Sequence, residues 1–280
     1  MALSITTNIP SLLAQNNLDN TNIALNKSIS RLSSGSRIVS SQDDPAGLAI
    51  SEKLKGNIVG TGVAKRNAND GISLLQVAEG AMTEISNILI RMKELTIQAA
   101  NETLSSTDRG FLDNEFQELE KEITRISLST KFNGVNLLSG AFSTAGLELQ
   151  VGLTGSVSDR MTVFISGVGP GTLGSGSFIS DVTISQSAGR ARNMIQFVEA
   201  AINDISGARS RIGSQLSRLS STVRNLSTSE VNLAQANSRI RDVDVASETA
   251  NLTKNQILMQ AGVSVLAQAN STTQFALSLL

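Results

Sequence analysis

The pattern of apolar and polar positions predicts long helices in both halves of the chain, separated by a short β-containing middle. In five segments, apolar residues recur at alternating intervals of three and four, which places them along one seam of a helix. One seam covers three heptads with Thr96 as its one polar position, at Leu75, Ala78, Met82, Ile85, Leu89, Met92, Thr96 and Ala99. The other seams are Leu18, Asn22, Leu25, Ile29 and Leu32; Leu112, Phe116, Leu119, Ile123 and Ile126; Val198, Ile202, Ile205, Arg209, Ile212, Leu216, Leu219, Val223 and Leu226; and Val263, Leu266, Asn270, Thr273, Leu277 and Leu280.

Turn and capping signals separate these helices. Ser33–Ser36 weakens the first, and Asp44 followed by Pro45 is typical of an N-cap and a first helical residue. Ser105–Asp108 offers another N-cap, and Asn133–Gly134 is a turn signal. The helices expected from these signals lie within residues 1–40, 45–101, 105–132, 184–236 and 251–280.

The middle of the chain has a strand pattern. Leu147–Val151 alternates apolar and polar residues, Met161–Ile165 is rich in β-formers, and Gly152–Asp159 between them is turn-like, which predicts a hairpin. The loop Gly167–Gly176 contains several glycines, but no Gly-Lys-Ser/Thr follows them, so a nucleotide site is not favoured.

We therefore expect a mainly α fold, an elongated antiparallel α-helical coiled-coil rod folded back on itself. A small β-hairpin lies at the tip, and the N- and C-terminal helices pair. The expected domains are a terminal-helix domain, residues 1–44 plus 237–280, and a coiled-coil rod domain, residues 45–236, with the hairpin at about 140–180.

The two ends have almost no charge. Asp19 is the only charged side chain in residues 1–26, and Lys254 is the only one in residues 251–280. Unfolded tails are normally rich in charge and poor in apolar residues, and these ends are the opposite. They are expected to become ordered where other molecules cover them.

Composition excludes several kinds of chemistry. The chain has no His, Cys, Trp or Tyr and a net charge of −1. Without His and Cys, zinc sites, thiol chemistry and Ser–His triads are excluded, and scattered Lys and Arg argue against a nucleic-acid surface. The paired carboxylates Asp43–Asp44 and Glu118–Glu122 are better explained as a helix cap and an exposed helix face. We expect no enzyme activity, cofactor or metal.

Nothing in the sequence indicates a membrane or a Sec-type signal. No apolar run approaches the length of a membrane span. The first ten residues lack a basic start followed by an apolar block.

Short motifs at both ends resemble those of bacterial flagellin, the subunit of the flagellar filament. Each motif is weak alone, but together and in this order they are highly specific and cover essentially the whole chain. They are Arg31–Arg37, Asp43–Asp44 with Ala46–Gly47, Arg66–Ile72, Glu79–Ala81, Lys93–Leu95 with Gln98–Ala100, Phe132–Gly134, Ser238–Ile240, Ala261–Gly262, Ser264–Asn270 and Leu277–Leu280.

The resemblance implies a self-assembling subunit of a hollow helical filament used for motility. Flagellin terminal helices line the inner wall and the rods form the shell. The subunits leave the cell unfolded through the flagellar type III apparatus and end up extracellular. Implied partners are further copies of the chain, an export chaperone, the filament cap and the hook–filament junction proteins. The implied inner-core assembly residues are Leu18, Leu25, Ile29, Leu32, Leu252, Leu258, Val263, Leu266, Phe275, Leu277 and Leu280.

The resemblance also implies residues for a host receptor, and two further expectations concern Lys254 and the alternative functions. Arg91, Leu95 and Glu115 match the residues that a host flagellin-sensing Toll-like receptor recognises in some relatives. Lys254 is expected to point away from the apolar seam, toward the lumen or a carboxylate. The alternative functions are a hook–filament junction protein and a secreted host-interacting ligand.

Overall fold

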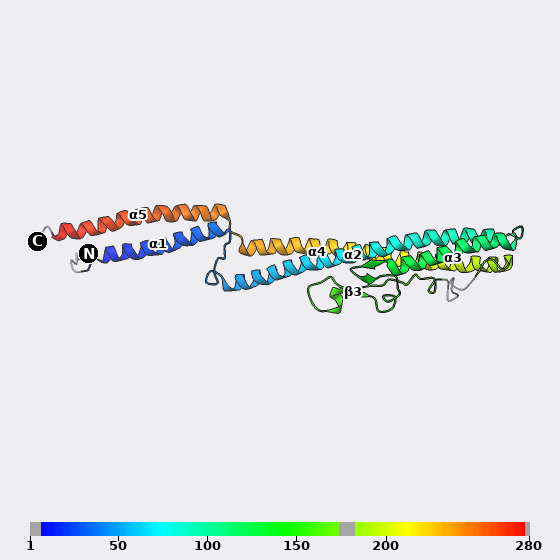
Figure 1. Cartoon of the computed structure of the whole chain (residues 1–280). Coiled ribbons are helices and arrows are strands. Elements are labelled where there is room, and N and C mark those ends of the chain that lie inside the picture. Colours follow the sequence, from blue (N-terminus) through cyan, green and yellow to red (C-terminus); the bar gives the residue numbers. More distant parts are fainter. Residues whose placement is uncertain (1–6, 174–182, 278–280) are drawn as a thin grey trace. The chain divides into compact units, whose positions relative to one another are not determined.

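The computed structural model describes residues 7–173 and 183–277, with side chains up to residue 271 (Figure 1). These residues form two compact units, one made of Met1–Ile58 with Val231–Leu280 and the other of Val59–Glu230. The fold is mainly α, as predicted. Its elements are α1 (Ile9–Ser34), α2 (Pro45–Ala99), α3 (Ser106–Ser129), β1 (Lys131–Phe132), β2 (Val135–Asn136), β3 (Leu147–Gln150), η1 (Val157–Asp159), β4 (Arg160–Val163), α4 (Ala188–Arg241) and α5 (Val245–Leu277).

Two of these helices begin at the capping residues predicted from the sequence. Asp44 accepts a hydrogen bond from the Gly47 N–H at 2.8 Å, and α2 starts at Pro45. Ser105 and Asp108 form a capping box at the start of α3. The compact units divide within α2 and α4, whereas the boundary expected from the sequence lies at residues 44 and 237.

The first unit is built on an antiparallel pair formed by α1 and α5. The Asn8 side-chain amide donates to the Ala269 carbonyl near one end, and Arg31 faces Glu248 near the other. Beyond the pair, the segments after α1 and after α4 are joined: the Arg37 N–H donates to the Arg241 carbonyl at 2.6 Å. Gly35, with φ at 67°, allows α1 to end and the chain to turn into this contact.

The second unit has a core made by α2, α3, α4 and the hairpin segments. Every side chain of the predicted α2 seam is fully buried, which confirms that seam. The buried core residues outside α2 are mainly Phe116, Ile123, Leu137, Leu138, Met161, Val163, Ile165, Ile184, Ala191, Met194, Val198, Ala201, Ile205, Ile212 and Leu219.

The predicted seam of α4 is wrong at three positions. Ala201, Ala208 and Gln215 are buried, whereas the sequence pattern placed their larger neighbours Ile202, Arg209 and Leu216 on the seam. Those neighbours are half-buried. Ala201 and Ala208 let the helices pack closely, and Gln215 is held by hydrogen bonds to the Phe164 backbone. The larger neighbours cover the edge of the seam.

Two short hairpins follow α3. β3 and β4 pair antiparallel, with Leu147 opposite Val163, which confirms the predicted hairpin. β1 and β2 form a second hairpin, which the sequence indicated only as a turn. Asn133 and Gly134 both have positive φ there, as a two-residue hairpin turn requires.

Glycines in α2 make room for the β3–β4 hairpin. A Cβ at Gly60 would lie 2.7 Å from Leu153 Cδ2, and one at Gly71 would overlap Leu149. α2 is unbroken at both positions. The close approach of the β3–β4 segment therefore explains the glycine at position 60.

Gln215 joins α4 to the chain leaving β4. Its side-chain oxygen accepts from the Phe164 N–H and its amide donates to the Phe164 carbonyl, both at 3.0 Å. Gln215 is 7% exposed. The side-chain amide thus replaces the neighbouring strand that these backbone groups would otherwise need.

Gln215→Met tests this link while nearly preserving side-chain volume. We expect a loss of about 1–3 kcal/mol in the free energy of unfolding, because the Phe164 backbone groups lose their partner. Urea unfolding measures the loss, with Ser217→Met at an exposed position as the control. Equal midpoints for the two variants would contradict this role.

Candidate functional site

Uncharged polar groups hold α1 and α5 together where the start of α1 lies beside residues 269 and 270 of α5. Asn8 caps α1 by accepting from the Ser11 N–H at 3.1 Å, and it donates to the Ala269 carbonyl at 3.1 Å. Ser11 donates to the Asn270 side-chain oxygen at 2.9 Å. These contacts satisfy buried polar groups without introducing charge.

The contact seam between α1 and α5 mixes leucines with small residues. Leu18, Leu25 and Leu32 lie on it, as predicted, but Ile29 is 48% exposed and Ser28 takes the seam position at 4%. The residues of α1 least exposed along its inner face are Ser11, Ala14, Leu18, Thr21, Leu25, Ser28 and Leu32.

The inner face of α5 shows the same shift. Leu252 and Leu266 lie on it, whereas Val263 is 54% and Leu258 46% exposed. Gly262 replaces Val263 on the seam, where a Cβ would come within 3.1 Å of Leu18 Cδ1. The seam positions of α5 are Glu248, Leu252, Asn255, Met259, Gly262, Leu266 and Ala269. The predicted side chains Phe275, Leu277 and Leu280 lie outside the described residues.

Small seam residues leave large apolar side chains on the outer faces. A soluble monomer rarely exposes a long apolar surface, so a surface of this kind indicates association. The exposed apolar residues of the pair are Ile9, Leu12, Leu13, Ile23, Ile29, Val245, Ile257, Leu258, Val263 and Val265.

A cluster of charges closes the other end of the pair. Lys27 Nζ lies 2.6 Å from Asp43, and Arg31 lies between Asp43 at 4.0 Å and Glu248 at 3.6 Å. The carboxyl groups of Asp43 and Glu248 are largely buried. Hydrogen bonds from Lys27 and from the Ser40 and Val39 N–H groups hold the pKa of Asp43 well below its usual range.

Asp43→Asn tests how this cluster holds the segment after α1. A depressed pKa stabilises the folded state above the unfolded pKa of about 3.9, and the contribution is lost as the pH falls through the folded value. At pH 7 we expect the amide protons of Val39 and Ser40 to exchange roughly tenfold faster in the variant, since a hydrogen bond to a charged group is lost. The difference should disappear in strong acid. A difference that persists there would contradict the role of the charge.

Two of the three predicted receptor residues lie at the surface of the second unit. Arg91 donates to Glu115 and Glu94 at 2.9 Å, and all three side chains are exposed. Leu95 is 1% exposed and belongs to the core. Because its side chain packs inward, Leu95 is corrected from a surface contact to a residue that supports this part of α2.

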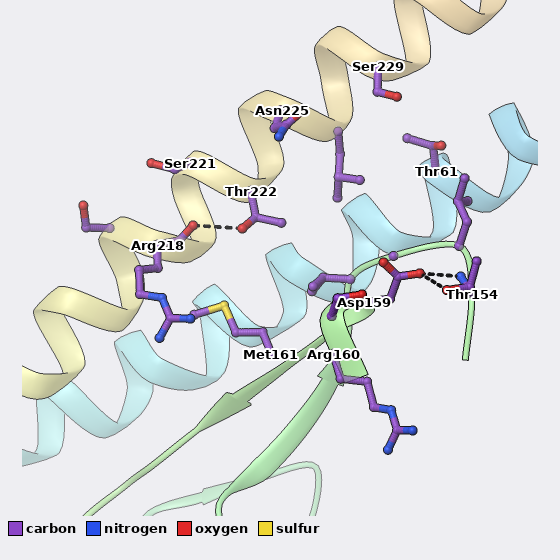
Figure 2. Close-up of a pocket in the computed structure, with 16 residues that line it drawn as sticks. Thr61, Thr154, Asp159, Arg160, Met161, Arg218, Ser221, Thr222, Asn225 and Ser229 are labelled. Carbon is purple, nitrogen blue, oxygen red and sulfur yellow. Dashed lines mark hydrogen bonds between the residues drawn. The ribbon is translucent and has the colours of Figure 1, made fainter. Parts of the chain in front are cut away.

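The second unit also has a groove of 720 Å³ beneath the β3–β4 loop (Figure 2). Thr61, Thr222, Asn225 and Ser229 face it from α2 and α4. Asp159 is already engaged: it accepts from the Thr154 N–H and hydroxyl, which lower its pKa. Asp159 is the one carboxylate among the described residues that line the groove, and it is held within its own loop. The α1–α5 surface is therefore the stronger candidate.

In the described part of the chain, no helix is both long and apolar enough to cross a membrane.

Comparison with known proteins identifies the family. Residues 5–143 match the model of the bacterial flagellin N-terminal helical region, and residues 195–280 match that of the C-terminal helical region. The chain is 41% identical to flagellin of Halalkalibacterium halodurans over 279 residues, covering 98% of both chains. It is 38% identical over 285 residues to the flagellar filament 33 kDa core protein of Treponema phagedenis, again with 98% of both covered.

A solved structure agrees with these matches. The crystal structure of Bacillus cereus flagellin aligns with a TM-score of 0.50 and 33% identity, covering 61% of this chain and 94% of that one. Together with the paired terminal helices and their exposed apolar faces, these matches show that the chain belongs to the bacterial flagellin family, whose members are structural proteins, and that it is a subunit of the flagellar filament.

Proposed function

We propose that the α1–α5 pair is the element through which copies of this chain assemble. The observation that carries the proposal is the set of exposed large apolar side chains on helices that have almost no charge. Buried in an assembly, each such side chain contributes about 1.5–3 kcal/mol. The inner wall of the filament is then built from residues 1–44 and 237–280, and the shell from residues 45–236.

The residues proposed for this wall act in two ways. Leu18, Leu25, Leu32, Leu252 and Leu266 hold α1 against α5. Ile29, Leu258 and Val263 are exposed in the single chain and contact neighbouring copies. The proposal extends to Phe275, Leu277 and Leu280, whose side chains are outside the described residues.

The proposed route to the filament follows from family membership. The chain leaves the cell unfolded through the flagellar type III apparatus and works outside the cell. An export chaperone shields the C-terminal helix beforehand, and the filament cap and hook–filament junction proteins contact the ends of the polymer. The exposed apolar residues of α5, Ile257 and Val265 among them, are a surface that such a chaperone would need to cover.

The exposed Arg91–Glu115 pair is the part of the chain that we propose for recognition by a host flagellin-sensing Toll-like receptor. The two side chains are paired and accessible on neighbouring helices. We propose no enzyme activity for this chain.

Sedimentation of purified protein with and without short filament seeds tests the assembly proposal. The expected result is that seeds convert soluble subunits into long filaments that pellet. Subunits that bind to seeds without extending them would instead indicate a hook–filament junction protein. A protein that stays monomeric at every concentration, with or without seeds, would indicate a secreted ligand.

A further inference from the structure

Two opposite charges on the outer surface of the terminal pair lie outside the ion-pair cluster of Lys27, Arg31, Asp43 and Glu248. Asp19 is the only charged side chain in residues 1–26, and Lys254 is the only one in residues 251–280. Both are exposed. Among the ion pairs of the described residues, neither takes part in one.

Asp19 and Lys254 are too far apart to pair within one chain. Leu18 lies opposite Gly262, and Arg31 lies opposite Glu248. In this antiparallel register Lys254 lies level with Asn26 of α1. It is therefore displaced from Asp19 by roughly seven residues, or about 10 Å at 1.5 Å per residue.

The two charges also lie on opposite flanks of the pair. If the seam residues take heptad positions a and d, with Leu18 and Leu252 at a, then Asp19 is at b and Lys254 at c. Ala261, one heptad after Lys254, lines a groove of 560 Å³ between α1 and α5. The c and g positions of both helices line that flank: Asn17, Asn20, Ala24, Leu258, Ala261 and Val265. Position b lies beside e, on the other side of the seam.

Exposed apolar side chains lie on the same flank as each charge. Leu12, Ile29 and Val263, at b and e positions, share the flank of Asp19. Leu13, Leu258 and Val265, at c and g positions, share that of Lys254. Lys27, at a c position of α1, lies on this flank too, but it is already paired with Asp43. An unpaired charge in an apolar contact is unfavourable because it loses its hydration, and an opposite charge within reach reduces that cost.

We propose that Asp19 of one copy forms an ion pair with Lys254 of a second copy lying beside it. This inference rests on the proposed function. The second copy is parallel to the first and shifted along the helix axis, so that the flank with Asp19 meets the flank with Lys254. Because the contact uses two different faces, it can repeat from copy to copy without closing in a dimer, as a helical array requires. The Asp19–Lys254 ion pair sets the axial register between neighbouring copies.

Charge reversal tests the pairing by seeded growth, with the subunit concentration that remains soluble as the readout. We expect Asp19→Lys and Lys254→Asp each to raise that concentration at least about tenfold, since each variant brings like charges together. The double variant should return to within about threefold of the parent chain, because it restores an opposite pair. Single variants that grow like the parent, or a double variant as defective as either single one, would overturn the pairing while leaving assembly intact. If the parent chain fails to grow, the proposed assembly fails, and the pairing fails with it.

Cross-linking locates the contact. The chain has no cysteine, so Asp19→Cys with Lys254→Cys introduces the only two thiols. In filaments treated with a short bis-maleimide, we expect a ladder of dimers, trimers and longer products, because each copy has both partners of the contact. Asn26→Cys with Lys254→Cys is the matched control: Asn26 has the same heptad position as Asp19 but lies one heptad away. Absence of the ladder, or an equal ladder in the control, would overturn the proposed register.

Discussion

Removal of Asn251–Leu280 is expected to abolish seeded filament growth while Val59–Glu230 stays folded. The deletion takes away most of α5 and with it the partner of α1. It also removes exposed apolar residues on which neighbouring copies would pack, including Ile257 and Val265. The core of the second unit contains none of the deleted residues, so its stability should change little.

Two measurements on the same protein check this result. Sedimentation and negative-stain microscopy with seeds report growth, and urea unfolding followed by circular dichroism reports the core of the second unit. A chain with the same thirty residues in scrambled order is the matched control, because it keeps length and composition but breaks the seam. We expect it to fail as the deletion does. Tubes formed by the deletion variant would contradict the assembly role of α5.

The sequence predicted the α2 seam of the second unit well because every position of that seam faces the same core. Residues from Leu75 to Ala99 of α2 pack against one core, so each apolar residue at the repeat is buried. The helix starts at Pro45 and after Ser105 were also predictable, since capping depends on local residues.

The terminal pair was harder to predict because its helices are apolar on more than one face. Periodicity alone selected Ile29 and Val263, but Ser28 and Gly262 lie on the seam beside them. Small residues allow α1 and α5 to approach, and the larger neighbours are left for other contacts. A pattern that counts only apolar residues cannot separate a fold contact from an assembly contact.

The polar contacts between distant segments were not predicted. The bond between Arg37 and Arg241 joins segments about two hundred positions apart. At Gln215, the apolar pattern placed the neighbouring Leu216 on the seam instead. One signal was present: Gln215 lies three residues after Ile212 and four before Leu219, both buried. A polar residue at such a position indicates a specific partner inside the core.

Phe116→Ala in α3 is expected to produce the largest loss of stability among single substitutions considered for the second unit. Phe116 is fully buried, and truncation of a buried Phe to Ala typically costs about 3–5 kcal/mol. α3 contributes few other fully buried side chains, with Ile123 the main one. The cavity therefore weakens the principal attachment of α3 to the core.

Glu115→Ala, at the adjacent position, separates burial from ion pairing. Glu115 accepts from Arg91 at 2.8 Å, but both side chains are about half exposed, at 45% and 49%. Exposed ion pairs contribute little, so the urea midpoint should stay close to that of the parent chain while that of Phe116→Ala falls sharply. Hydrogen exchange should locate the Phe116→Ala effect first in α3, because the α2 seam is packed by other residues as well. Similar midpoints for the two variants would mean that α3 is held by its surface charges instead of by its buried face.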